Sequence, residues 1–154
     1  IFPGQRFKRQ DIGGWTVIDD SYNANPLSAG RMLQAAAELS KDGLLVCVMG
    51  EMGELGDAAG QEHRQLGRNI ARSGCSALFW VGGHQEQVRQ GLADQGYAGY
   101  LGYASSPENF MELFRLQAKG LKRSGKRVIL FKGSRMNHLE NLVSLFTREA
   151  SHVL

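Results

Sequence analysis

The apolar residues of this chain follow two alternating patterns. Short, nearly continuous apolar runs at residues 15–18, 44–49, 77–81 and 128–131 predict buried strands, and residues 97–101 form a weaker run of the same kind. Between these runs, apolar positions recur at steps of three and four. This spacing predicts helices over about 26–40, 58–72 and 85–92, a fourth beginning at 105–108, and a last one beginning near Ser134. The alternation predicts an α/β fold with a mainly parallel sheet of five to six strands.

Local signals support several of these boundaries. Asn25 followed by Pro26 is typical of a helix cap and a first helical position, and Asp57 is the expected cap of the second helix. The run Ser105-Ser106-Pro107-Glu108 is a further helix start. Residues 6–10 fit an additional edge strand, so the first ten residues are expected to form a hinge or edge segment.

Composition narrows the class of protein. The 154 residues are 42% hydrophobic and 21% charged, which predicts one globular domain over residues 1–154. No apolar run approaches the roughly 18 residues of a membrane-spanning helix. Basic residues cluster at 6–9 and 119–127 without an aromatic platform, so nucleic acid is not an expected partner, and the lack of a long apolar run argues against a membrane. Cys47 and Cys75 form no C-x-x-C pair, which fits a cytoplasmic protein. The chain begins at Ile1 without Met, so we expect it to be part of a longer protein.

Polar loops follow three of the predicted strands. In a parallel α/β sheet, ligands bind at the carboxyl ends of the strands, and residues 19–25, 50–57 and 132–135 fall there. The first loop offers more hydrogen-bonding groups than a turn needs, which favours a ligand; an elaborate helix cap is the alternative. The loops together predict a ligand-binding half-site at this edge, because no complete catalytic triad or metal cluster accompanies them.

The other two loops differ in charge. The run from Gly50 to Asp57 is acidic, which suits an amine-bearing ligand, and its glycine spacing is not that of a dinucleotide fingerprint. His63 follows it and is either a ligand contact or a satisfied, partly buried histidine. The run Lys132-Gly133-Ser134-Arg135 opens a helix and suits an anion such as a carboxylate or phosphate; a capped helix with two exposed cations is the alternative.

These motifs resemble one known family. The run Asp19 to Pro26, the block Gly50 to Gly56 with His63, and the block Lys132 to Arg135 resemble the C-terminal domain of the Mur ligase family. Within the family, they are most similar to members that join D-alanyl-D-alanine to UDP-MurNAc-tripeptide. The resemblance implies a Rossmann-like domain with helices on both faces of the sheet. It also implies a role in bacterial, cytoplasmic peptidoglycan precursor synthesis through an ATP-dependent acyl phosphate.

The resemblance also implies partners and residue roles. This domain would close over the central domain of a ligase that also has an N-terminal domain, and Mg²⁺ would be held mainly by the central domain. It implies ATP contacts from Arg6, Asp20, Tyr22 and Asn23, and substrate contacts from Asn25, Glu51, Glu54, His63, Lys132, Ser134 and Arg135. It assigns this chain no catalytic residue and no metal ligand, so the chain alone is expected to be inactive.

One departure and two alternatives accompany the resemblance. Family members usually carry Pro-Gly-Arg at the hinge, whereas this chain has Pro3-Gly4-Gln5-Arg6, so Arg6 takes the ATP contact only with a one-residue shift. One alternative is the C-terminal domain of another Mur or folylpolyglutamate-type ligase. The other is a stand-alone module that binds a nucleotide or amino acid without catalysis.

Overall fold

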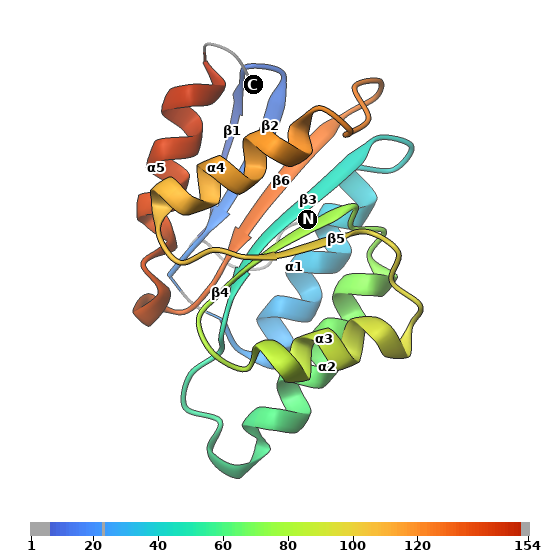
Figure 1. Ribbon diagram of the computed structural model, residues 1–154, viewed down its shortest axis with the longest axis vertical. Coiled ribbons are helices and arrows are strands. Elements are labelled where there is room, and N and C mark those ends of the chain that lie inside the picture. The colour runs from blue at the N-terminus through green and yellow to red at the C-terminus, as the bar shows by residue number, and fades with distance from the viewer. Residues whose placement is uncertain (1–6, 23, 152–154) are drawn as a thin grey trace.

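The protein forms one mixed sheet covered by helices on both faces (Figure 1). The computed structural model describes residues 7–22 and 24–151. Its strands are β1 (Lys8–Ile12), β2 (Trp15–Asp20), β3 (Leu44–Gly50), β4 (Ala77–Val81), β5 (Tyr100–Tyr103) and β6 (Arg127–Lys132). Its helices are α1 (Pro26–Leu39), α2 (Ala59–Arg72), α3 (Gln85–Asp94), α4 (Pro107–Ala118) and α5 (Leu139–Ala150), with short 3-10 turns η1 (Gly56–Ala58) and η2 (Arg135–Asn137).

The strand order explains where the polar loops meet. The six strands lie in the order β1-β2-β6-β3-β4-β5, and only β1 runs antiparallel to its neighbour. Strands β2, β6 and β3 are therefore adjacent and parallel, so their carboxyl ends lie at one edge of the sheet. The predicted α/β class and mainly parallel sheet are confirmed, including the edge strand near the start of the chain.

Two hydrophobic layers hold the helices to the sheet. Helices α1, α2 and α3 pack on one face and α4 and α5 on the other (Figure 1). Alternate residues of β3 enter the two layers: Leu45, Cys47 and Met49 on the first face, and Leu44, Val46 and Val48 on the second. A strand buried on both faces needs apolar residues at every position, which accounts for the continuous run in the sequence.

Three predicted boundaries differ from the structure. The strand predicted at residues 97–101 instead spans Tyr100–Tyr103, and the Tyr97 hydroxyl donates to the Tyr100 carbonyl at its start (2.8 Å). The last helix begins at Leu139 rather than near Ser134, since His138 has a φ of +51° between η2 and α5. Asp57 lies within η1 and makes no capping hydrogen bond to α2.

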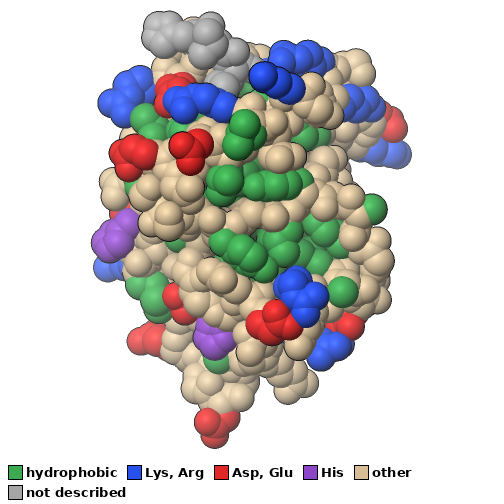
Figure 2. Space-filling model, viewed as in Figure 1, with side chains coloured by type: hydrophobic (Ala, Val, Ile, Leu, Met, Phe, Trp, Pro, Cys, Tyr) green, Lys and Arg blue, Asp and Glu red, His purple; other side chains and the backbone are tan. Residues whose placement is uncertain are grey.

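The basic cluster predicted at residues 119–127 lies before and at the start of β6, at the opposite end of that strand from the polar loops. Lys41, Lys119, Lys122, Arg123 and Lys126 are exposed around the segments that precede β3 and β6. Figure 2 shows Lys and Arg side chains gathered at the upper end of the visible face. Lys122 donates to the main-chain carbonyl of Asp42 (2.9 Å), so part of this charge ties two surface segments together. In the described part of the chain, no helix is long and apolar enough to cross a membrane.

Candidate functional site

The ends of β2 and β6 carry a buried ion pair. Asp20 and Lys132 are direct neighbours across the parallel ladder and are the last residues of their strands. Lys132 Nζ donates to Asp20 Oδ2 at 2.6 Å, and the two side chains are 2% and 9% exposed respectively. Lys132 was expected to face a substrate anion. Its side chain is instead turned into the protein, because the carboxylate that it pairs with lies beside it on the next strand.

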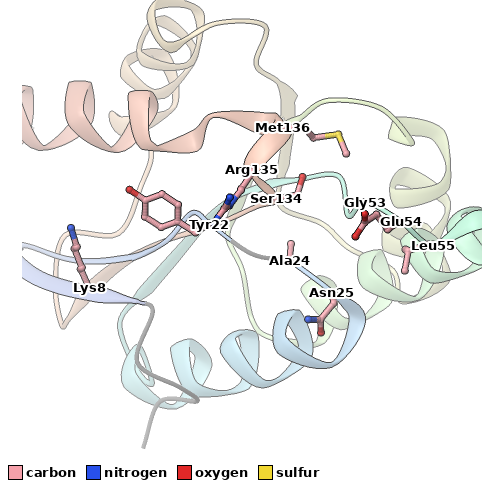
Figure 3. Close-up of a pocket in the computed structure, with 10 residues that line it drawn as sticks. All are labelled: Lys8, Tyr22, Ala24, Asn25, Gly53, Glu54, Leu55, Ser134, Arg135 and Met136. Carbon is pink, nitrogen blue, oxygen red and sulfur yellow. The ribbon is translucent and has the colours of Figure 1, made fainter.

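A cavity of about 990 Å³ lies between the three polar loops, and its described lining includes neither Asp20 nor Lys132 (Figure 3). Its lining comprises Lys8, Tyr22, Ala24, Asn25, Gly53, Glu54, Leu55, Ser134, Arg135 and Met136. Figure 3 shows Tyr22 and Lys8 on one side of the cavity and Glu54 and Leu55 on the opposite side. The predicted meeting of the three loops at one edge of the sheet is therefore found in the structure.

The lining of the cavity combines charged and apolar side chains. Arg135 and Lys8 supply positive charge, and Glu54 supplies negative charge across the opening. Tyr22 is 48% exposed and Met136 is 55% exposed, so both offer apolar surface to a ligand. Such a surface suits a ligand that carries charges of both signs.

Asn25 both lines the cavity and caps α1. Its side-chain oxygen accepts a hydrogen bond from Ser28 N (2.9 Å), and the Ser28 hydroxyl is 3.3 Å from Asn25 N. This reciprocal arrangement is a capping box, and it confirms the cap that the sequence predicted. Because the Asn25 oxygen serves the helix, the side-chain NH₂ is the group left for a ligand.

The acidic loop is anchored by His63. This side chain is fully buried and does not line the cavity. Its Nδ1 lies 2.7 Å from the Ala59 carbonyl and its Nε2 accepts from Met52 N at 2.9 Å, so both ring nitrogens are engaged by the protein. Burial lowers the pKa of His63, although the Ala59 contact opposes that shift. The structure therefore matches the alternative of a satisfied, buried histidine, which holds the loop, and not the substrate contact that the resemblance implied.

Two of the three acidic residues of this loop, Glu51 and Glu54, have different environments. Glu51 accepts a hydrogen bond from Gly83 N at 2.9 Å, which ties the end of β3 to the loop after β4. Glu54 is exposed, lines the cavity and has a φ of +58°, a conformation that non-glycine residues rarely adopt. Of the two predicted carboxylates, Glu54 is therefore the one presented to a ligand.

The loop after β6 is organised by Asn137, which the sequence analysis did not identify. Its side-chain oxygen accepts from Ser134 N (2.9 Å) and lies 3.0 Å from the Ser134 hydroxyl. That hydroxyl is also 3.0 Å from the Glu51 carbonyl, so two of the three loops are in direct contact. The three-residue spacing from Ser134 to Asn137 is a capping signal that would have located it. Lys8 and Met136 also line the cavity and carried no sequence signal.

Two expected ATP contacts, Arg6 and Asn23, lie outside the described residues. Within residues 7–22 and 24–151, no group of three or more His, Cys, Asp or Glu side chains is placed to hold a metal ion. The described site is thus a cavity with hydrogen-bonding and charged groups, formed by the loops that follow β2, β3 and β6.

Comparisons with known proteins place the chain in one family. The family described as "Mur ligase, glutamate ligase domain" matches residues 5–135. The UDP-N-acetylmuramoyl-tripeptide–D-alanyl-D-alanine ligase of Mycobacterium tuberculosis is 45% identical over 73 residues, which are 45% of this chain and 14% of that protein.

Solved structures of MurF proteins superpose on nearly the full length of this chain. MurF from Acinetobacter baumannii superposes with a TM-score of 0.73 at 31% identity, over 93% of this chain and 30% of that one. MurF ligase from Thermotoga maritima, solved in complex with ADP, gives a TM-score of 0.75 at 23% identity, over 94% of this chain and 31% of that one. The chain spans less than a third of the length of these proteins. Since the family match covers most of the chain, including all three polar loops, this protein belongs to the Mur ligase family through its glutamate ligase domain.

Proposed function

We propose that this chain is the C-terminal domain of an ATP-dependent ligase that joins D-alanyl-D-alanine to UDP-MurNAc-tripeptide in bacterial peptidoglycan synthesis. The observation that carries the proposal is the meeting of three family-type loops around one cavity with charges of both signs. The substrates in this proposal are those in the name of the similar ligase from Mycobacterium tuberculosis. A cavity at the surface of this domain also suits closure against the central domain of the same ligase.

The charges of the cavity fit the incoming dipeptide. D-alanyl-D-alanine is a zwitterion with a carboxylate at one end and an amine at the other. Arg135 is exposed at the cavity and suits the carboxylate, with Ser134 beside it, and Glu54 suits the amino end. The NH₂ group of Asn25 is a further donor toward the same space.

The nucleotide would lie nearer to β2. The exposed ring of Tyr22 offers a stacking surface, and the Asp20 carboxylate suits the ribose hydroxyls because it is an ionic acceptor at the strand end. When bound, ATP supplies the phosphoryl group that activates the substrate carboxylate. The proposal gives Mg²⁺ no ligand among the described residues and assigns its coordination to the central domain.

The test uses the full-length protein that contains this chain. ADP release is measured with ATP, UDP-MurNAc-tripeptide and one of three amines: D-alanyl-D-alanine, diaminopimelate or glutamate. We expect turnover only with the dipeptide. Turnover with diaminopimelate or glutamate instead would overturn the substrate assignment in favour of another ligase of the family.

A pair of variants tests the cavity itself. Arg135→Gln is expected to raise the KM for the dipeptide by about tenfold or more, because a charge-assisted hydrogen bond to the carboxylate is lost. Arg123→Gln, at an exposed arginine on the segment before β6, is the matched control and should leave KM unchanged. Equal KM values for the two variants would place the dipeptide elsewhere.

The isolated chain separates the ligase from a stand-alone binding module. A domain that needs closure on a partner makes only part of its ligand contacts alone, so we expect weak ADP binding by calorimetry. Micromolar or tighter binding by the isolated chain, with no ligase activity of the full-length protein, would support the binding module instead.

A further inference from the structure

Lys132 is a buried charged residue at a strand position where an apolar residue would also fit the fold. Its neighbours across the ladder are Asp20 on β2 and Met49 on β3, so one side of it is charged and the other apolar. The preceding residues of β6, from Val128 to Phe131, are all buried and apolar. Replacing a buried ion pair by apolar residues of similar volume is often neutral or stabilising, so stability is a poor explanation for this pair.

The two members of the pair are not equally accessible. The side chain of Lys132 is 2% exposed and that of Asp20 is 9% exposed, so most of the exposed surface of the pair belongs to Asp20. Lys132 engages Oδ2, and no described residue donates a hydrogen bond to Oδ1. A carboxylate has about four lone-pair sites, and Oδ1 therefore retains capacity for an external donor.

We infer that Lys132 is a positioning residue that holds the Asp20 carboxylate, through Oδ2, in the orientation in which Oδ1 accepts a hydrogen bond from a ribose hydroxyl of the nucleotide. This inference rests on the proposed function, which gives Asp20 its contact with the nucleotide. Lys132 itself touches neither nucleotide nor dipeptide, because its ammonium group is enclosed beneath the carboxylate.

The Ser21 hydroxyl, next to the ion pair in the sequence, makes no hydrogen bond to Asp20 among the described residues. Ser21 follows Asp20, is fully buried, and its Oγ has no hydrogen-bond partner among the described residues. Ser21 N donates to Asp19 Oδ1 at 3.2 Å, so the main chain after Asp20 is turned by the preceding carboxylate. The orientation of the Asp20 side chain therefore depends chiefly on Lys132, since the described hydrogen bonds to that side chain come from Lys132 alone.

The experiment measures discrimination between ATP and its 2′-deoxy and 3′-deoxy forms by the full-length protein. The readout is the ratio of kcat/KM for ATP to that for each deoxynucleotide, because a purely structural role lowers all three values alike. The variants are Asp20→Asn, Lys132→Met and the double variant, with Lys119→Met as an exposed lysine control.

Each variant has a defined expectation. Asp20→Asn should reduce discrimination against one deoxynucleotide by about tenfold, as a hydrogen bond to a charged acceptor weakens. Lys132→Met should reduce it to a similar extent, and the double variant should lose no more than Asp20→Asn alone. Lys119→Met should keep the wild-type ratio.

The experiment distinguishes a failure of the proposed nucleotide contact from a failure of the positioning role of Lys132. If Asp20→Asn leaves discrimination unchanged, the nucleotide contact in the proposed function is wrong. If Asp20→Asn reduces discrimination and Lys132→Met does not, the nucleotide contact holds and the positioning role is wrong. Should Lys132→Met not fold, because Asp20 is left as a buried unpaired charge, Lys132→Arg decides, since it keeps the charge while its forked N–H groups engage both carboxylate oxygens. Reduced discrimination by Lys132→Arg supports the inference, and the wild-type ratio overturns it.

Discussion

The main-chain N–H of Met52 donates a hydrogen bond to Nε2 of His63 at 2.9 Å in the interior of the protein. The other ring nitrogen, Nδ1, lies 2.7 Å from the Ala59 carbonyl and so carries the proton. This pair of contacts requires the neutral ring, because a proton on Nε2 would face the N–H of Met52. The loop that presents Glu54 to the cavity therefore depends on an uncharged His63.

This dependence predicts a loss of stability in mild acid. Burial lowers the pKa of His63 below its ordinary value of 6.5; proximity to His84 adds to the shift, while Ala59, Glu51 and Glu62 oppose it. Just below pH 6.5, His63 therefore binds a proton more readily in the unfolded chain than in the folded protein. The free energy of unfolding should fall as pH drops below about 6.5, by at most about 1.4 kcal/mol per pH unit from this group. Urea denaturation between pH 8 and pH 5 measures it.

Two variants separate His63 from other titrating groups. His63→Phe should be destabilised by about 1–3 kcal/mol at pH 8, since Met52 N–H loses its partner, and its stability gap to the wild type should shrink as pH falls. His138→Phe changes a side chain that is 70% exposed and should follow the wild-type pH profile. A gap that stays constant from pH 8 to pH 5 would show that His63 does not titrate in this range.

The Ser21 hydroxyl should contribute little to stability. It is buried without a hydrogen-bond partner among the described residues, so its removal costs no interaction. Ser21→Ala should change the free energy of unfolding by less than about 0.5 kcal/mol, or raise it. Ser40→Ala is the comparison, because Ser40 Oγ donates to the Ala36 carbonyl at 2.8 Å, and it should cost about 1 kcal/mol. A larger loss for Ser21→Ala would reveal a partner for its hydroxyl.

Gly50 and Asn137 should be energetically coupled. A Cβ on Gly50 would lie 2.3 Å from Asn137 Oδ1, too close for any real contact. Gly50→Ala should therefore destabilise the protein by about 1–3 kcal/mol. In an Asn137→Ala background the same change should cost much less, which a double-mutant cycle measures by urea denaturation. Additive effects would mean that the loop after β6 adapts without the Asn137 contact.

The aromatic layer under α4 should dominate the stability of that face. Phe114 is fully buried and packs against the rings of Trp15 and Phe146, with centroid distances of 5.6 and 5.2 Å. Phe114→Ala should cost about 3–5 kcal/mol. Leu116→Ala, on the same helix at 67% exposure, should cost less than about 0.5 kcal/mol. Similar losses for both variants would contradict the assignment of the buried face of α4.

Local patterns alone were enough to identify most elements and the edge of the sheet where the ligand groups gather. Hydrophobic periodicity reports which face of a segment is buried, and it identified the strands from Trp15, Leu44, Ala77 and Arg127 to within two residues at either end. The cap at Asn25 was also predicted, because its partner Ser28 lies three residues away in the chain.

The tertiary structure alone decided what the site residues contact. Asp20 and Lys132 are 112 residues apart, and their pairing follows from the placement of β6 between β2 and β3. The same is true of the contact between His63 Nε2 and Met52 N, which forms when α2 packs beneath the loop, whereas the contact of Nδ1 with Ala59 lies within one helical turn. Sequence spacing determines which face of an element a side chain occupies, whereas the strand order determines which charge or N–H group lies opposite it.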